Sequence, residues 1–184
     1  MERTGRLARP VEMRIFYFGN LFTLLLCFSL WGILQLGAAL FCLSLPDRLF
    51  SPDRLFCRPF RWENNGEVYE TLLHVKSWKH LLPDGAAAWR KRGYRKRSLT
   101  DFSEENLQRF LIESARGELS HWLAIAPFWL FGFFAPFYVV WIMLAYALAV
   151  NFPCIVAQRY NRPRIQALLA RKYPRGLSRA AGPR

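Results

Sequence analysis

The chain has 184 residues, of which 53% are hydrophobic and 16% aromatic, and its formal net charge is +13. This length suits one domain, and apolar stretches flanked by basic segments are typical of a membrane protein rather than of a soluble nucleic-acid-binding module. The four cysteines have no C-x-x-C spacing. We therefore expect buried thiols and no disulfide or metal framework.

The first apolar stretch covers residues 15–45 and contains no charged side chain. It is far longer than the apolar core of a signal peptide, roughly 7–15 residues, which predicts a retained transmembrane helix. At ~1.5 Å per residue such a helix exceeds a ~30 Å hydrocarbon core, so it must tilt, kink or project beyond it.

The polar region 46–118 is predicted to lie on the cytoplasmic surface of the membrane. The turn signal Asn64-Asn65-Gly66 favours short strands or an irregular hairpin within residues 61–78. The basic run at residues 90–97 suits either anionic headgroups or a specific phosphate. Ser103 is predicted to cap an amphipathic helix that lies along the interface and leads into the next apolar region.

The second apolar stretch lacks charged residues from Trp122 to Ala157. Its length exceeds one simple crossing, and Gly132 and Pro136 favour a break near residues 132–136. We therefore predict a transmembrane hairpin over residues 119–158, with a short or re-entrant first arm, and a basic tail over 159–184. The predicted fold is a single all-α integral membrane domain over residues 1–184 with about three crossings.

The basic residues also predict the topology. The first 14 residues carry 4 Lys and Arg, residues 47–118 carry 14, and the tail from residue 159 carries 8. With three crossings, the central region and the tail share one side. The positive-inside rule predicts that this side is the cytoplasm, in a multi-pass cell-membrane protein.

Histidines with nearby acids are the candidate catalytic groups. Glu118 and His121 lie three residues apart, where a carboxylate can orient an imidazole and raise its basicity. His80 and Asp84 form a second possible pair across a Pro turn. The alternative is that His121 and Trp122 only anchor the helix at the membrane boundary. A di-iron site needs two Glu-x-x-His motifs and the chain has one, so no metal is expected.

The end of the second apolar stretch is dense in polar residues. Asn151 and Pro153 are predicted to interrupt the helix, because proline removes a backbone hydrogen bond. Arginine side chains beyond them suit bidentate phosphate binding. A stop-transfer cluster is the alternative, but it requires only charge. The polar residues beyond Pro153 are Gln158, Arg159, Tyr160, Asn161, Arg162 and Arg164.

In these motifs the chain resembles the glycosyl-4,4'-diaponeurosporenoate acyltransferases of staphyloxanthin-type carotenoid synthesis. The resemblance spans residues 46–169 in order, and its last block is the most specific. The basic run at 90–97 has no counterpart in the pattern. The matching motifs are Pro46-Asp47-Arg48, Trp78-Lys79-His80 with Asp84-Gly85, Ile112-Glu113 with Arg116, Glu118-Leu119, His121-Trp122, Asn151-x-Pro153, Gln158 to Arg164, and Leu168-Leu169.

The resemblance implies transfer of a fatty acyl group, with acyl-CoA as co-substrate and no bound cofactor, to a sugar hydroxyl of a lipid glycoside. His121 or His80 would be the base, and Lys79 and the tail arginines would hold the CoA phosphates. The bilayer, acyl-CoA and the glycoside are the expected partners, without nucleic acid. The alternatives are a transferase with an unrelated lipid acceptor and a non-catalytic scaffold that binds pigment or partner enzymes.

Overall fold

The structure, a computed structural model, describes residues 10–51, 60–82 and 101–174, with side chains from residue 21 onward. Within these ranges the chain is helical and has no strand, which confirms the all-α prediction there. The elements in order are α1 (Pro10–Ser44), η1 (Asp47–Phe50), η3 (Arg61–Gly66), α2 (Glu67–Leu73), α3 (Val75–Trp78), η4 (Lys79–Leu81), α4 (Glu104–Ile125), η6 (Ala126–Phe133) and α5 (Phe137–Lys172).

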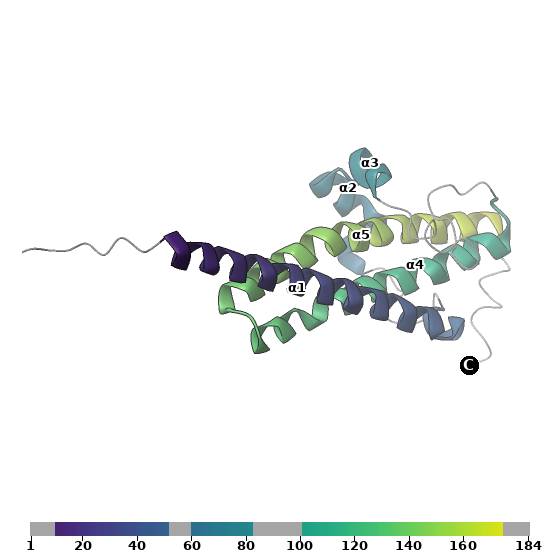
Figure 1. Ribbon diagram of the computed structural model, residues 1–184. Coiled ribbons are helices and arrows are strands. Elements are labelled where there is room, and N and C mark those ends of the chain that lie inside the picture. The colour runs from purple at the N-terminus through teal and green to yellow at the C-terminus, as the bar shows by residue number, and fades with distance from the viewer. Residues whose placement is uncertain (1–9, 52–59, 83–100, 175–184) are drawn as a thin grey trace, which may run out of the picture.

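Two of the described helices are long and apolar enough to cross a membrane. They are α1, over Leu21–Ser44, and α5, over Phe137–Lys172. Both run along the long axis of the molecule, with α4 beside them (Figure 1). Length and composition therefore support two crossing helices. The predicted third crossing would be formed by the helical segment that precedes α5.

A helical hairpin forms the second half of the structure. Its arms are α4 with η6 on one side and α5 on the other, and they join at Phe134 to Pro136, where we predicted the break. The first arm ends in a 3₁₀-helix of eight residues. Because a 3₁₀-helix rises about 2.0 Å per residue, this segment reaches about 16 Å with few residues. The short or re-entrant first arm remains a prediction, because the arm that packs beside α5 comprises 22 residues of α4 and 8 of η6.

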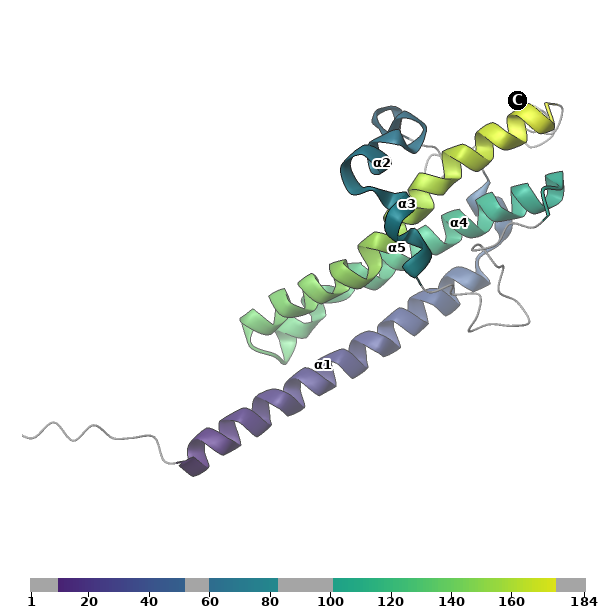
Figure 2. The same ribbon diagram turned by 90° about the horizontal axis from the view of Figure 1, so that it is seen from above.

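Two details of the hairpin differ from the prediction. The amphipathic helix does not form a separate element along the interface, because α4 continues in line into η6 and lies beside α5 (Figures 1 and 2). The prolines also do not interrupt the second arm, since α5 continues through Pro153 and Pro163 to Lys172. A helix tolerates such a residue where neighbouring helices support it, so part of the predicted basic tail is helical.

The predicted strands at residues 61–78 are wrong, because this segment forms η3, α2, α3 and η4. The turn signal itself is correct. Asn64, Asn65 and Gly66 have φ of 42°, 54° and 84°, in the left-handed region that asparagine and glycine tolerate. The turn leads into α2 instead of a second strand.

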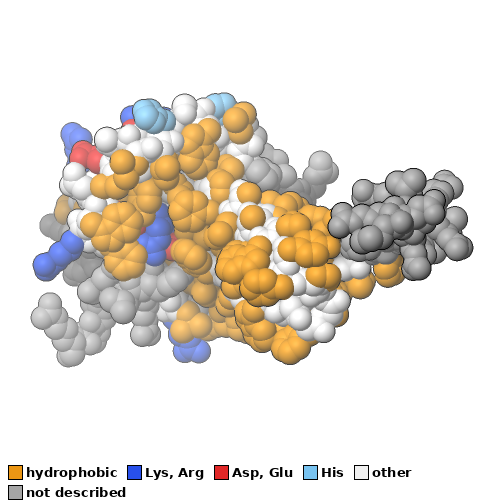
Figure 3. All heavy atoms as spheres, turned by 90° about the vertical axis from the view of Figure 1, so that its left-hand side faces the viewer, with side chains coloured by type: hydrophobic (Ala, Val, Ile, Leu, Met, Phe, Trp, Pro, Cys, Tyr) orange, Lys and Arg blue, Asp and Glu red, His pale blue; other side chains and the backbone are white. Residues whose placement is uncertain are grey.

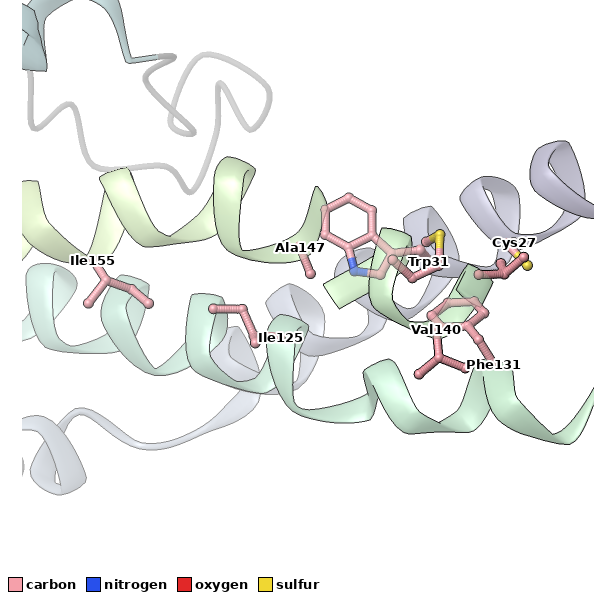
Figure 4. Close-up of a cluster of buried hydrophobic side chains, with 9 residues drawn as sticks. Cys27, Trp31, Ile125, Phe131, Val140, Ala147 and Ile155 are labelled. Atoms are coloured by element: carbon pink, nitrogen blue, oxygen red, sulfur yellow. The ribbon is translucent and has the colours of Figure 1, made fainter. Parts of the chain in front are cut away.

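The apolar core lies between α1 and the hairpin. Figure 4 shows Cys27 and Trp31 of α1 beside Phe131, Val140 and other residues of η6 and α5. Cys27 and Cys42 are buried free thiols, as expected, whereas Cys154 is a free thiol that is only partly buried. Large apolar side chains cover much of the outer surface, and Figure 3 shows them on the hairpin end of the molecule. This surface is typical of contact with lipid.

The other end of the bundle is held by polar contacts. Ser103 caps α4 by accepting a hydrogen bond from the backbone N–H of Asn106, as predicted. Arg116 of α4 forms ion pairs with Asp47 of η1 and, at 2.6 Å, with Glu113. It also donates to the Leu45 carbonyl at 3.3 Å. Arg116 therefore joins the end of α1 to α4.

Candidate functional site

Buried charges meet where α4 lies beside the polar half of α5. Arg159 Nε lies 2.6 Å from Glu118 Oε1, and an Arg162 Nη2 lies 2.5 Å from Glu118 Oε2. Ser114 of α4 donates to Gln158 at 2.8 Å on the same contact. Glu118 is therefore in direct contact with the 158–164 block. This contact arises because the hairpin returns α5 antiparallel to α4.

Glu63 of η3 brings a second carboxylate to this cluster. Its Oε1 lies 2.8 Å from an Nη1 of Arg159 and accepts a 2.5 Å hydrogen bond from the Tyr69 hydroxyl. Its Oε2 accepts from the Phe60 backbone N–H at 2.7 Å. Burial, followed by the Glu63 carboxylate, raises the pKa of Tyr69 well above its ordinary value. Tyr69 is therefore a neutral donor to Glu63.

Glu63, Glu118, Arg159 and Arg162 form what we call the buried ionic quartet. Both carboxylates are fully buried, and the side-chain exposure of Arg159 and Arg162 is 12% and 3%. The four charges sum to zero, which is the condition under which buried ions are tolerated. Because both guanidinium groups already bind carboxylates, this geometry favours a structural role for Arg159 and Arg162. Their predicted binding of phosphate remains a prediction.

His121 lies next to the quartet, and one of its ring nitrogens contacts a residue of α5. Its Nδ1 lies 2.8 Å from Oδ1 of Asn151, and the Asn151 amide nitrogen donates to the Ala147 carbonyl at 2.9 Å. This second bond orients the Asn151 amide with its oxygen toward His121. The oxygen can only accept, so Nδ1 carries the proton and the lone pair of the neutral ring lies on Nε2. Asn151 therefore orients the imidazole, and the predicted action of Glu118 on His121 remains a prediction.

Asn151 is itself fully buried, whereas His121 is partly exposed. The His121–Asn151 pair lies where the apolar first half of α5 gives way to its polar second half. Trp122 is exposed, and its indole N–H points to Glu118 Oε1 at 3.4 Å. A partly exposed base on a fixed partner, at the edge of an apolar bundle, is suited to proton transfer at an interface.

A third group of predicted residues lies on the opposite side of α5. The α2–α3 segment packs there, where Tyr69, Val75 and Trp78 meet Val156 and Tyr160. Lys79 Nζ donates to Asn161 Oδ1 at 3.0 Å and lies 4.8 Å from the centre of the Tyr160 ring. The Arg164 guanidinium lies 3.7 Å from the same ring. The polar block thus divides between two sides of α5.

The predicted pairing of His80 with Asp84 remains a prediction. His80 is exposed in η4, and Asp84 lies outside the described residues, as does the basic run at 90–97. Glu63 was missed because it lies in a segment that we expected to form strands. Two signals could have identified Glu63 in the sequence. It is an isolated acid among aromatic residues, and two buried arginines need a second negative charge beside Glu118. Within the described ranges, no group of three or more potential metal ligands converges.

Gly66 allows the η3–α2 segment to pack closely against α5. Its φ is 84°, and a Cβ there would lie 2.8 Å from an Arg164 Nη1 and 3.0 Å from the Tyr160 carbonyl oxygen. We expect Gly66→Ala to lower the free energy of unfolding by about 1–3 kcal/mol, because the left-handed conformation and the contact both oppose the methyl group. Thermal unfolding in detergent measures the change. Gly32→Ala, where the added Cβ meets nothing within 4 Å, is the control, and equal stability of both variants would contradict this prediction.

These features define a small helical protein with two helices of membrane-crossing length and a polar site at one end of the bundle. The chain belongs to the glycosyl-4,4'-diaponeurosporenoate acyltransferase family, whose model matches residues 48–171. The relative of that name from Staphylococcus haemolyticus is 34% identical over 138 residues, which cover 75% of this chain and 80% of the relative. A Staphylococcus aureus relative is 34% identical over 147 residues, 80% of this chain and 88% of its own. No solved structure matches the chain.

Proposed function

We propose that this acyltransferase moves a fatty acyl group from acyl-CoA to a sugar hydroxyl of a glycosylated carotenoid acid or a similar lipid glycoside, at the membrane surface. The observation that carries the proposal is the 2.8 Å contact between His121 Nδ1 and Asn151 Oδ1, which leaves the lone pair on Nε2. A hydroxyl is a weak nucleophile near neutral pH and requires such a base. The acceptor class follows the names of the relatives.

In the proposed reaction, Nε2 of His121 removes the proton of the sugar hydroxyl while the oxygen attacks the thioester carbonyl carbon. The tetrahedral intermediate then collapses, the carbon–sulfur bond breaks, and His121 returns the proton to the departing thiolate. The products are the ester and free CoA, without an acyl-enzyme intermediate. Asn151 holds the ring in one tautomer and orientation throughout, which is the role of the third group in hydrolase triads.

The division of α5 supports an interfacial site. From Phe137 to Val150 the helix is apolar, with Trp141, Ile142 and other large side chains exposed, and the ionic quartet begins beyond Asn151. An acyl chain and a polyene can lie against the apolar half, while the sugar and thioester remain at the polar half. The buried neutral quartet supports the backbone around this boundary.

The direct test is acyl transfer by the purified full chain in nanodiscs. We expect the wild type to convert acyl-CoA and a long-chain glucoside to an acylated glycoside, detected by mass spectrometry. Lipid extracts of cells that produce a glycosylated carotenoid acid, with and without the gene, identify the natural acceptor. Absence of any acylated product in both assays would contradict the proposal.

The topology has its own test. We propose that the η3–α5 polar end faces the cytoplasm, because most of the basic residues flank it. A cysteine replacing exposed Ser77 of α3, in a variant without the native cysteines, should react with a membrane-impermeant maleimide only after the cells are opened. A cysteine replacing exposed Phe133, at the hairpin turn, should react in intact cells. The opposite labelling pattern would overturn this orientation.

A further inference from the structure

Two cations on the side of α5 where α2 and α3 pack do not belong to the ionic quartet. Lys79 and Arg164 are both half-buried, and both lie against the Tyr160 ring, at 4.8 and 3.7 Å from its centre. Lys79 donates to Asn161 Oδ1 and Arg164 donates to the Tyr160 carbonyl, and both of these acceptors are neutral. This arrangement differs from that of Arg159 and Arg162, whose guanidinium groups pair with carboxylates.

The local charge at this position is positive. Glu70 is the acid that acts on Lys79, whereas Arg164 and Lys76 both oppose its charge. Burial, followed by the nearby Arg164, lowers the pKa of Lys79 below its ordinary value. Holding half-buried cations close together has an electrostatic cost, which a bound anion would remove.

The position is also structurally defined. Lys79 follows Trp78, which packs in the cluster that docks the η3–η4 segment on α5. Arg164 is held in place by its hydrogen bond to the Tyr160 carbonyl and by the close approach of Gly66. Tyr160, whose ring both cations contact, is 1% exposed. Both cations are therefore held in place by packed neighbours, unlike cations on a solvated surface.

We infer that Lys79 and Arg164, which both contact the Tyr160 ring, bind the phosphoryl groups of the acyl donor. This inference rests on the proposed acyl-CoA-dependent function and assigns its phosphate contacts to this pair rather than to the quartet. A guanidinium group and an ammonium group are the usual protein partners of phosphate.

The distance between the Lys79–Arg164 pair and His121 determines which class of acyl donor can reach both. Tyr160 lies nine residues beyond Asn151, which is about 14 Å along the axis of α5. The α2–α3 segment and α4 also pack on different sides of α5 (Figure 1). The phosphates and the reacting carbonyl must therefore be joined by a long flexible arm. A CoA thioester, with pantetheine between its diphosphate and its sulfur, has such an arm, whereas an acyl phosphate does not.

Calorimetric titration of CoA into the full chain, in phosphatidylcholine nanodiscs, tests the inference. We expect Lys79→Gln and Arg164→Gln each to weaken CoA binding roughly ten- to a hundredfold, because each removes a charge-assisted contact. Lys172→Gln is the matched control. Its ammonium donates to the Phe102 carbonyl at 3.1 Å and lies 5.4 Å from the Tyr173 ring, so the same kind of cation is lost elsewhere on α5. It should bind CoA as the wild type does.

Two further binding measurements identify the molecule that supplies the phosphate. Inorganic pyrophosphate should compete with CoA in the wild type, and pantetheine, which lacks phosphate, should bind equally to wild type and variants. If the Gln variants bind CoA normally but lose affinity for phosphatidylglycerol vesicles, the pair binds lipid headgroups and the inference is overturned. Unchanged binding of both would overturn it as well.

Steady-state rates separate this inference from the proposed function. The Gln variants should raise KM for acyl-CoA and leave kcat near its wild-type value, a split that general destabilisation would not produce. Lys79→Arg keeps the charge and should keep most of the affinity, which controls for misfolding. If the wild type transfers no acyl group, the proposed function fails. If it does so and the variants keep its KM, only this inference fails.

Discussion

Replacing His121 by alanine should lower kcat for acyl transfer about 100- to 10,000-fold, the usual contribution of a general base. The loss is expected because Nε2 is the atom that would take the proton from the acceptor hydroxyl. Initial rates of product formation at saturating acyl-CoA measure it. The unfolding temperature of the variant should fall only slightly, because His121 is partly exposed and the substitution removes one contact of buried Asn151.

Two other histidines make this prediction specific. His74→Asn keeps the left-handed backbone of that exposed residue, with φ 49°, and should retain full activity. His80→Ala tests the second candidate base, which is exposed in η4. Full activity of both His121→Ala and His80→Ala would refute the assignment of the base and favour the scaffold alternative.

Asn151→Asp tests whether this residue positions the imidazole. A carboxylate at 2.8 Å from Nδ1 would favour the protonated ring and raise the pKa of His121. Because the reaction needs the neutral imidazole, the acidic limb of the kcat/KM profile should move to higher pH. A purely structural role of Asn151 would lower activity without moving that limb.

The second large effect concerns the ionic quartet. Glu118→Gln should lower the free energy of unfolding by about 3–5 kcal/mol, because it leaves buried Arg162 without a carboxylate and Arg159 with only Glu63. Thermal or denaturant unfolding in detergent measures the change. Glu105→Gln, an exposed acid at the start of the same helix, should change stability by about 0.5 kcal/mol or less.

A double variant tests the reason for this loss. In Glu118→Gln/Arg162→Met the uncompensated buried cation is gone, so stability should recover relative to Glu118→Gln alone. If the two substitutions instead destabilise additively, each residue contributes by packing and the quartet is not an electrostatic unit. Wild-type stability of Glu118→Gln would contradict the prediction directly.

Local sequence patterns were sufficient for most of the secondary structure. The uncharged runs predicted α1 and the hairpin, Ser103 predicted the start of α4, and Gly132 and Pro136 predicted the break between the arms. The strands expected around Asn64-Asn65-Gly66 did not form, because a turn signal does not specify whether a strand or a helix comes after the turn. The apolar face of α2 and α3 packs on α5, and that contact favours helices.

The sequence by itself determined the all-α class in the described ranges, the family, and the residues that belong to the polar block. Only the tertiary structure decided their partners. Glu118 binds Arg159 and Arg162 because the hairpin places them together, and Glu63 joins from a segment 55 residues earlier in the chain than Glu118. His121 meets Asn151 for the same reason. Helical periodicity specifies which face a residue occupies, whereas the pairing of two faces depends on how distant segments pack.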